Sequence, residues 1–290
     1  MARRKPPTVH GLVVVDKPAG MTSHDVVAQL RKSLKEKRVG HAGTLDPDAT
    51  GVLVVGVGNA TRLMRFMSGM DKEYVAQIVF GSETDTLDSA GTVTQTYAMS
   101  PPDLVETQRI IDAQFIGDIL QIPPMVSALR VDGKRLHQLA REGIEVDRAP
   151  RPVHVHEFNV SATADPMVLQ ATVRCGSGTY IRSLGADLGT ALGGGAHIRA
   201  LQRTSVGPFG LSDACSLDQP VLQNVLTAVR EMEQVTLDAD GIDNVLYGRP
   251  LPSWDGTGPW AILNEAGELI AVYEKWKNDL AKPTVVFGGR

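Results

Sequence analysis

Strand-length runs of apolar residues recur along this chain, and they constrain its fold more than any other feature. Residues 11–15 and 52–57 are continuous apolar stretches rich in valine, which predicts buried strands. Residues 74–80 and 168–174 alternate apolar and polar side chains, as half-buried strands do. We expect residues 91–96 to pair with residues 74–80. No run reaches the about 18 apolar residues of a membrane-spanning helix, so we predict that the protein does not enter a membrane.

Helical spacing of apolar residues alternates with these strands. Thr22 or Ser23 can cap a helix, Asp25 places a negative charge in its first turn, and apolar residues follow at spacings of three and four. The sequence predicts helices over residues 24–36, 60–67, 103–115, 181–192 and 221–232. Strands and helices interspersed in this way indicate an α+β protein.

The composition is that of an ordinary globular protein. Of the 290 residues, 42% are hydrophobic and 21% are charged, which excludes a disordered or collagen-like chain. The two cysteines, Cys175 and Cys215, are too few for a typical structural zinc site and indicate a reducing compartment. The apolar stretch at residues 12–15 is too short for the core of a signal peptide. We therefore expect a cytoplasmic protein.

The net charge of −4 conceals an uneven distribution. Residues 1–72 carry a net charge of +6, whereas residues 73–230 and 231–290 each carry −5. Five basic side chains lie in and just after the second half of the predicted helix 24–36: Arg31, Lys32, Lys35, Lys37 and Arg38. They form either an ordinary solvated helix face or a surface that binds the phosphates of a polyanion.

Two segments stand apart from the main series of strands and helices. Residues 122–151 mix six Lys or Arg with four Asp or Glu and show no clear periodicity, which indicates a projecting insertion. Residues 235–290 contain short β-like runs separated by Gly, Pro and Asp, which indicates a small β-rich C-terminal domain. We expect the main domain to span residues 8–232.

The segment 40–51, Gly-His-Ala-Gly-Thr-Leu-Asp-Pro-Asp-Ala-Thr-Gly, concentrates residues that can carry chemistry. Pro47 restricts the backbone of Asp46, so this carboxylate lies on a rigid loop before an apolar strand and is a candidate nucleophile or base. On composition alone, a turn in which the Asp46 side chain bonds to nearby backbone is the more common outcome. A third alternative, a glycosidase, would use Asp46 and Asp48 as paired carboxylates, which the intervening Pro47 disfavours.

Motifs for other kinds of chemistry are absent from the sequence. It contains no His-Glu-x-x-His zinc motif, no Gly-x-x-x-x-Gly-Lys-Ser/Thr phosphate loop and no Gly-x-Ser-x-Gly nucleophile elbow. Gly56-Val-Gly58 lacks the rest of a dinucleotide-binding fingerprint. These absences argue against a metal site, nucleotide-driven chemistry and serine hydrolysis.

Long motifs follow one another in order over most of residues 11–205. They occupy residues 11–24, 40–51, 72–74, 84–88, 123–129, 178–182 and 195–201. In content and order they resemble the TruB family, the tRNA pseudouridine-55 synthases. The family isomerises one uridine in the T-loop of tRNA by breaking its N-glycosidic bond and rejoining the base through C5.

The resemblance implies a pseudouridine synthase fold, with a mixed, mostly antiparallel sheet and flanking helices. It places an RNA-gripping insertion at residues 122–151 and a small PUA-like domain at residues 235–290. It implies no cofactor and no metal, and the T-arm stem-loop of tRNA as the partner. We expect a monomer without an obligate protein partner, because the chain lacks the large basic extensions of relatives that work in guide-RNA complexes.

The same motifs imply roles for individual residues. Asp46 is the catalytic carboxylate, Tyr74 stacks on the flipped uracil and assists proton removal from C5, and Arg182 pairs with Asp46 and keeps it ionised. The implied substrate-binding residues are His41, which enters the T-loop, the wall residues Tyr180, Ile181 and Leu201, and Lys17, which contacts phosphate. From the residues alone, Tyr74 is more simply a core residue of an alternating strand and Arg182 a surface ion-pair partner.

The function implied by these motifs is isomerisation of uridine-55 to pseudouridine with base flipping. Asp46 could first attack the sugar, attack the base or act as a base. The alternative from a different class is a non-catalytic tRNA-binding or tRNA-folding protein on the same scaffold.

Overall fold

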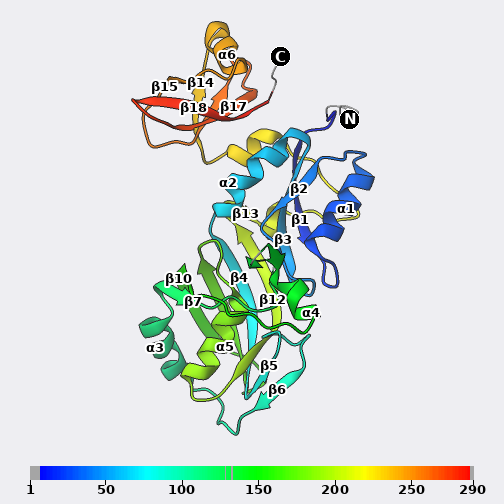
Figure 1. Cartoon of the computed structure of the whole chain (residues 1–290), viewed down its shortest axis with the longest axis vertical. Coiled ribbons are helices and arrows are strands. Elements are labelled where there is room, and N and C mark those ends of the chain that lie inside the picture. The colour runs from blue at the N-terminus through cyan, green and yellow to red at the C-terminus, as the bar shows by residue number, and fades with distance from the viewer. Residues whose placement is uncertain (1–6, 128, 132, 288–290) are drawn as a thin grey trace.

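A nine-stranded sheet organises most of the chain (Figure 1). The computed structural model describes residues 7–127, 129–131 and 133–287. The sheet follows the order β1-β3-β12-β4-β11-β10-β7, with β2 paired to β3 and β13 paired to β12. Its strands are β1 (Gly11–Lys17), β2 (Val39–Ala42), β3 (Thr50–Val57), β4 (Lys72–Phe80), β7 (Gly117–Gln121), β10 (Arg151–Ala162), β11 (Val168–Cys175), β12 (Ala196–Val206) and β13 (Phe209–Gly210). Among these pairings that of β3 with β12 is parallel and the others are antiparallel, which confirms the predicted α+β class and mixed sheet.

Both faces of β1 are buried, which explains its continuous apolar sequence. Val13 and Val15 belong to one hydrophobic core, together with the buried residues of α1 (Ser23–Ser33) and α5 (Ile181–Ala191). Leu12 and Val14 point the other way, into a second core that also contains residues of the C-terminal sheet. The alternation of side chains along one strand thus serves two cores at once.

Strand β4 lies in the middle of the sheet and is buried on alternate residues, as its sequence predicts. The predicted pairing of residues 91–96 with this strand is wrong. β6 (Val93–Thr96) pairs instead with β5 (Ser82–Thr84), because β4 already has β11 on one edge and β12 on the other.

Helix α1 begins where its local sequence predicts. The Thr22 hydroxyl accepts a hydrogen bond from the Asp25 N–H (3.1 Å), and the Asp25 carboxylate accepts one from the Thr22 N–H (2.9 Å). The helix ends at Ser33, earlier than predicted, and Lys35 adopts φ = 52° in the following turn. The basic side chains Lys35 and Lys37 therefore lie on an exposed turn rather than on a helix.

The remaining helices of the main sheet lie close to the predicted ranges. They are η1 (Gly58–Leu63, a 3₁₀ helix), α2 (Met64–Gly69), α3 (Leu104–Gln114) and α5. Within the described part of the chain, no helix is long and apolar enough to cross a membrane.

The predicted helix over residues 221–232 is wrong. Short 3₁₀ helices, η2 (Leu211–Asp213) and η3 (Val225–Val229), lie in and near this region. The segment between them runs along the outer edge of β1, where Leu12 and Gln223 exchange backbone hydrogen bonds of 3.0 and 2.7 Å. This pairing satisfies polar groups at the edge of the sheet, which a helix would have left open.

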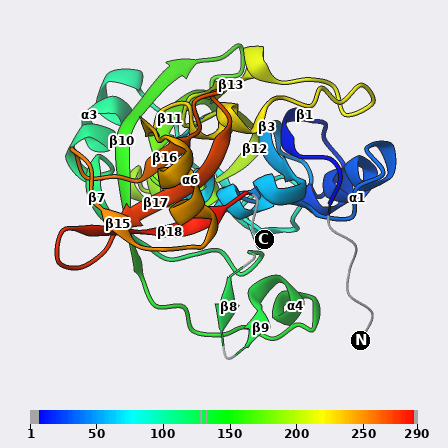
Figure 2. The same cartoon turned by 90° about the horizontal axis from the view of Figure 1, so that it is seen from above.

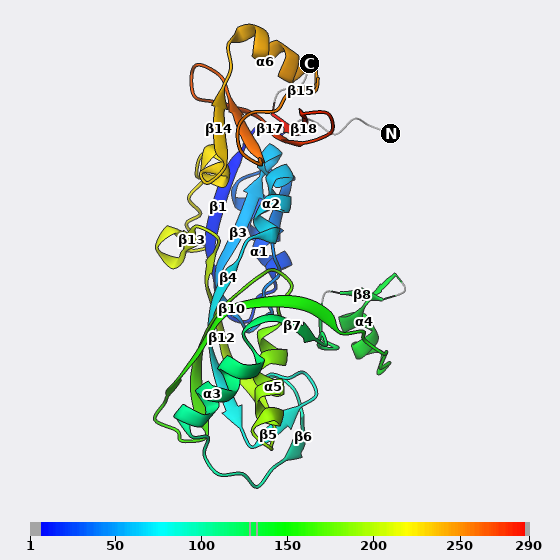
Figure 3. The ribbon, with the colours of Figure 1, turned by 90° about the vertical axis from the view of Figure 1, so that its left-hand side faces the viewer.

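The segment between β7 and β10 projects from the sheet (Figures 2 and 3). It contains β8 (Arg130–Val131), β9 (Lys134–Arg135) and α4 (Leu136–Arg141). Residues 128 and 132 of the predicted insertion lie outside the described residues. Ser127, near the start of the insertion, also lines a cavity in the main domain, together with the largest group of predicted site residues.

A five-stranded sheet with the order β14-β16-β17-β18-β15 forms the C-terminal part (Figure 1). Its elements are β14 (Glu233–Thr236), α6 (Ala239–Leu246), β15 (Leu251–Pro252), β16 (Trp260–Leu263), β17 (Leu269–Lys275) and β18 (Leu280–Val286). Ala261, Val272 and Val285 of this sheet belong to the second core, together with Leu12 and Val14 of β1. A shared core therefore joins the β-rich C-terminal part to the main sheet.

Candidate active site

The loop between β2 and β3 carries Asp46 and is anchored by the residues around α1. The Ser23 hydroxyl donates a hydrogen bond to the Leu45 carbonyl (3.2 Å) and accepts one from the Leu45 N–H (2.9 Å). The Gly20 N–H donates to the Pro47 carbonyl at 3.0 Å. The backbone on both sides of Asp46 is thus held by buried or backbone partners.

Lys17 anchors the same loop and is fully buried. Its Nζ donates to the carbonyl oxygens of Pro18 (2.8 Å), Met21 (2.7 Å) and Pro47 (2.9 Å). Burial lowers the pKa of this ammonium to about 8. The prediction that Lys17 contacts a phosphate is therefore wrong, because all three of its hydrogens are donated to backbone inside the protein.

The Asp46 carboxylate pairs with Arg182, as predicted. Nε of Arg182 lies 2.9 Å from Oδ2 of Asp46. The backbone of Asp46 also forms a turn, since its carbonyl accepts a hydrogen bond from the Ala49 N–H at 3.2 Å, but the carboxylate faces Arg182 rather than this turn. Burial raises the pKa of Asp46, and the neighbouring guanidinium opposes this rise without cancelling it.

Arg182 lies in the first turn of α5, and its side chain is only 4% exposed. Nη1 donates to the Thr86 carbonyl (2.8 Å) and Nη2 to the Val126 carbonyl (2.7 Å). A second carboxylate, Asp88, lies 3.5 Å from Nη1. Arg182 is therefore a buried hub, and the alternative of a surface ion pair is wrong.

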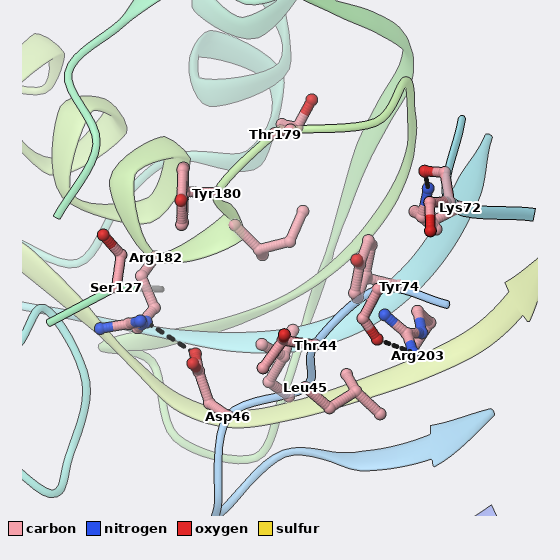
Figure 4. A pocket seen from close by; sticks show the side chains of 15 residues that line it. Thr44, Leu45, Asp46, Lys72, Tyr74, Ser127, Thr179, Tyr180, Arg182 and Arg203 are labelled. Carbon is pink, nitrogen blue, oxygen red and sulfur yellow. Dashed lines mark hydrogen bonds and ion pairs between the residues drawn. The ribbon is translucent and has the colours of Figure 1, made fainter. Parts of the chain in front are cut away.

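The ion pair borders a cavity of about 250 Å³ (Figure 4). In the figure Tyr180 and Arg182 border it from the start of α5, and Lys72 and Tyr74 border it from β4. Its volume lies below the roughly 300–1,000 Å³ of pockets for drug-sized ligands, so it suits one flat ring. The cavity brings together six of the predicted site residues: Asp46, Tyr74, Tyr180, Ile181, Arg182 and Leu201.

Tyr74 is a core residue that also borders the cavity. It is 8% exposed and belongs to the first hydrophobic core, yet it also lines the cavity. Burial raises the pKa of its hydroxyl, and a hydrogen bond with the Arg203 side chain opposes the rise. An aromatic ring held this firmly is suited to stack against a planar ligand.

Tyr180 precedes α5 and is held through its backbone. The Tyr180 N–H donates to Oε1 of Gln121 (2.8 Å), and Nε2 of Gln121 donates to the Tyr180 carbonyl (3.0 Å). Burial raises the pKa of the Tyr180 hydroxyl, and a hydrogen bond with the Ser127 side chain opposes that rise. This anchoring ties the wall of the cavity to β7 and to the start of the insertion.

His41 lies in β2 and is not among the residues that line the cavity. Its ring meets that of His24 edge-to-face with centroids 5.5 Å apart. Burial lowers the pKa of His41, and the positive charges of His24 and Arg203 lower it further. His41 therefore lies outside the cavity, and its contact with an RNA loop stays a prediction.

Two buried cations of the cavity were missed by sequence reasoning. Lys72 donates to the carbonyls of Ser68 (2.8 Å) and Met70 (2.5 Å), and burial lowers its pKa to about 8. Its spacing of two from Tyr74 on an alternating strand is a signal that could have found it. Arg203 donates to the carbonyls of Val52 (2.8 Å) and Gly43 (3.2 Å). No local signal marks Arg203, because the register of β12 shifts by one residue between Ile198 and Ala200 before Arg203 pairs with Tyr74.

A second, smaller cavity of about 180 Å³ lies on the other side of the ion pair. Asp46 and Arg182 line both cavities, whereas Asp48 and Asp88 line only the second. Asp48 therefore does not border the cavity that Tyr74 and Tyr180 line, whereas Asp46 and Asp48 both border the second one. Within the described residues, no group of three or more His, Cys, Asp or Glu side chains could hold a metal ion.

Comparisons with protein families identify two matching segments. Residues 31–181 match the model of the TruB family pseudouridylate synthase N-terminal domain. Residues 182–246 match the tRNA pseudouridylate synthase B C-terminal domain.

Individual proteins agree with these matches over nearly the whole chain. A tRNA pseudouridine synthase B of Corynebacterium aurimucosum is 52% identical over 282 residues, which cover 93% of this chain and 94% of the relative. That of Mycobacteroides abscessus is 44% identical over 272 residues and covers 90% of this chain and 91% of the relative. Among solved structures, an H/ACA RNP bound to a substrate RNA containing 2′-deoxyuridine matches with a TM-score of 0.72 and 25% identity, covering 97% of this chain and 86% of the matched chain.

Proposed function

Because this chain belongs to the TruB family of pseudouridylate synthases, we propose that it isomerises uridine-55 in the T-loop of tRNA to pseudouridine. Its relatives are named tRNA pseudouridine synthase B, and the chain is an isomerase that acts on tRNA. The observation that carries the proposed chemistry is the carboxylate of Asp46. It is paired with a buried arginine at the edge of a cavity that fits one ring.

We assign the reacting role to Asp46. It acts either as a nucleophile, which attacks the ribose or the uracil, or as a general base. The position of Asp46 at an enclosed cavity supports this role. After the N-glycosidic bond breaks, the uracil must stay bound in the cavity while it rotates to present C5 to the ribose. Tyr74 stacks on the uracil and assists proton removal from C5. Tyr180, Ile181 and Leu201 supply the other walls of the cavity. The proposed reaction uses no metal and no organic cofactor.

Extrusion of the uridine from its loop costs a few kcal/mol of stacking. A stack on Tyr74 returns about 1–3 kcal/mol, and His41 would occupy the space that the flipped nucleotide leaves. The exposed basic turn after α1, with Lys35, Lys37 and Arg38, supplies phosphate contacts. The insertion at residues 122–151 closes over the RNA from the side of the cavity on which it projects.

We propose the following organisation of the whole chain. Residues 8–232 form the catalytic domain and residues 235–290 a small PUA-like domain. The protein works as a monomer in the cytoplasm on free tRNA, without an obligate protein partner. The chain is 40–52% identical to proteins named tRNA pseudouridine synthase B but 25% identical to a chain of the H/ACA complex. This difference supports an enzyme that works without partner proteins.

The test is tritium release from C5-labelled uridine in an unmodified tRNA transcript. We expect release by the wild type from the T-loop uridine and none by Asp46→Asn, while tRNA affinity stays within about tenfold, or ~1.4 kcal/mol. Asp48→Asn is the matched control, because it removes an exposed carboxylate two residues away. Its activity should stay close to that of the wild type.

A different pattern would favour the non-catalytic alternative. If neither protein releases tritium but both bind tRNA tightly, the chain is a tRNA-binding or tRNA-folding protein. If Asp46→Asn is fully active, the mechanism assigned to Asp46 is wrong.

A further inference from the structure

The two ends of the cavity differ in charge. In Figure 4, Asp46 and Arg182 lie at one end, and Lys72, Tyr74 and Arg203 lie at the other. At the first end the guanidinium of Arg182 faces a carboxylate at 2.9 Å. At the second end two cations lie beside a phenol whose pKa burial raises. We call Lys72 and Arg203 the cationic end of the cavity.

Neither cation of this end forms an ion pair with a carboxylate in the part of the chain that the structure describes. Lys72 is 6% exposed and Arg203 is 1% exposed, and both donate to backbone carbonyls. Asp71, the carboxylate whose charge acts on Lys72, is engaged by His156 at 2.9 Å. A buried charge without a counter-ion costs free energy, which hydrogen bonds to carbonyls offset only in part.

The two cations also lie close to each other. A Cβ at Gly43 would lie 3.5 Å from Nη1 of Arg203 and 3.7 Å from Cε of Lys72. Burial, and then the positive charge of Arg203, lower the pKa of Lys72 to about 8. The Cys175 thiol does not balance this charge, because burial raises its pKa to about 11. The fold therefore gains little from the pair, and the excess positive charge suits a negative charge that arises in the cavity during a reaction.

Isomerisation of uridine places a negative charge on the uracil ring whichever role Asp46 takes. If the carboxylate attacks the ribose or removes a ribose proton, the N-glycosidic bond breaks and its electron pair stays on N1, with charge on both carbonyl oxygens. If the carboxylate adds to C6, the pair of the C5–C6 double bond moves toward the C4 carbonyl oxygen. The charge is gone once C5 has joined C1′, the C5 proton has left, N1 holds a proton and Asp46 is a free carboxylate again.

We propose that Lys72 and Arg203 are catalytic residues that stabilise this negative charge on the uracil ring. The inference rests on the proposed function, since it takes uridine isomerisation as the reaction. Both side chains line the cavity. An ammonium group has three hydrogens, and Lys72 donates two of them to the carbonyls of Ser68 and Met70. Cations already in place in a site closed to water stabilise a developing anion without reorganisation.

A backbone phosphate is a less suitable partner for the cationic end. The cavity measures about 250 Å³, and a phosphodiester would bring two sugars with it. The exposed basic side chains that suit phosphates lie elsewhere, on the turn after α1.

The test uses a fluorine substituent, which withdraws electrons and so stabilises the uracil anion without help from the protein. Two tRNA transcripts carry either uridine or 5-fluorouridine at the target position, and mass spectrometry after nuclease digestion follows the loss of the target nucleoside in a single turnover. We expect Lys72→Met and Arg203→Met each to slow the reaction of uridine about 10²- to 10³-fold, as loss of a donor to a developing anion does. With 5-fluorouridine each loss should be at least about fivefold smaller, because less stabilisation is needed in the transition state.

Lys17→Met is the matched control. Lys17 is also a buried lysine that donates to backbone carbonyls, and burial lowers its pKa to about 8, but it does not line this cavity. Its replacement should slow both substrates by the same factor. A cationic end that only supports the fold would behave in the same way, so equal losses with the two substrates for Lys72→Met and Arg203→Met would overturn the proposal.

A second measurement keeps the charge at residue 72 and does not depend on the folding of the methionine variants. Lys72 is charged below its pKa of about 8, so the activity of the wild type should fall as the pH rises through this value. Lys72→Arg stays charged and should keep its activity there. The groups whose charges act on Lys72 are Arg203, Cys175 and Asp71, and the pKa of Cys175 is about 11. Lys17 titrates in the same range as Lys72, so a fall that persists in Lys72→Arg would be due to Lys17 and would overturn the proposal.

The outcomes separate this inference from the proposed function. A wild type that leaves uridine unchanged overturns both. An active wild type with equal losses for the two substrates overturns only the role of the cationic end. If Lys72→Met and Arg203→Met instead raise KM and flatten the salt dependence of tRNA binding with kcat unchanged, the cationic end binds a phosphate and the proposal is wrong.

Discussion

Nε of Arg182 lies 2.9 Å from Oδ2 of Asp46, and the same guanidinium donates to two backbone carbonyls from other parts of the chain. The arginine therefore does more than balance one charge. It ties the loop of Asp46 to the segments that carry Thr86 and Val126, and it holds the carboxylate at the cavity. Since burial still raises the pKa of Asp46, the ionised carboxylate is less solvated than in water, which supports the reacting role proposed for it.

The raised pKa of Asp46 predicts the acidic limit of activity. If the ionised carboxylate is the active form, activity is present above the folded-state pKa and is lost as the pH falls through it. We expect this limb above the ordinary aspartate value of about 3.9, and we expect Arg182→Met to move it higher, since the guanidinium is what opposes the rise. Single-turnover tritium release, measured across acidic pH for the wild type and for Arg182→Met, gives the acidic limit of each protein. A limb at or below the ordinary value in the wild type would contradict the prediction.

Lys17→Met is expected to reduce kcat while leaving tRNA affinity and its salt dependence unchanged. Three carbonyls lose their donor, and each buried unsatisfied group costs about 1–3 kcal/mol, so the melting temperature should fall as well. Arg109→Met, which removes an exposed charge on α3, serves as the control. If Lys17→Met instead makes tRNA binding less dependent on salt, Lys17 contacts a phosphate, as the sequence predicted.

Replacing Lys35, Lys37 and Arg38 together with alanine is expected to weaken tRNA binding without changing kcat. Each lost phosphate contact should flatten the slope of log affinity against log salt by about 0.9. The side chains are exposed, and Arg38 gives up only a 3.0 Å hydrogen bond to Asn59, so the fold should be little affected. An unchanged slope in filter-binding titrations would place the RNA on another surface.

Gly51→Ala is expected to destabilise the protein by at least about 2 kcal/mol. Gly51 has φ = +100°, and a Cβ there would lie 2.2 Å from the carbonyl oxygen of Arg203, its neighbour in the parallel pairing of β3 and β12. Gly69→Ala at the end of α2 is the matched control, because its Cβ would meet nothing within 4 Å. Urea unfolding of the two variants gives the comparison, and similar midpoints would contradict it.

The sequence alone predicted the features that depend on near neighbours. The apolar runs of β1 and β3 and the alternation of β4 and β11 predicted strands, because burial on one or both faces leaves its period in the side chains. Thr22 and Asp25 predicted the start of α1, because a capping box needs only residues three apart. Family resemblance predicted the role of Asp46, its pairing with Arg182 and the six residues that line the cavity. Motifs that match a family in content and order identify the positions of its functional residues.

The tertiary structure decided whatever depends on partners far along the chain. The sequence predicts a helix over residues 221–232, but Gln223 pairs with Leu12 at the open edge of β1 and only Val225–Val229 form a short 3₁₀ helix. Lys17 could have reached a phosphate, but three carbonyls around one buried ammonium occupy it. Arg203 lines the cavity because, after a shift in register between Ile198 and Ala200, β12 places it opposite Tyr74 of β4. Local sequence sets which conformations a segment prefers, whereas the hydrogen bonds and cavities that select among them form only when distant segments meet.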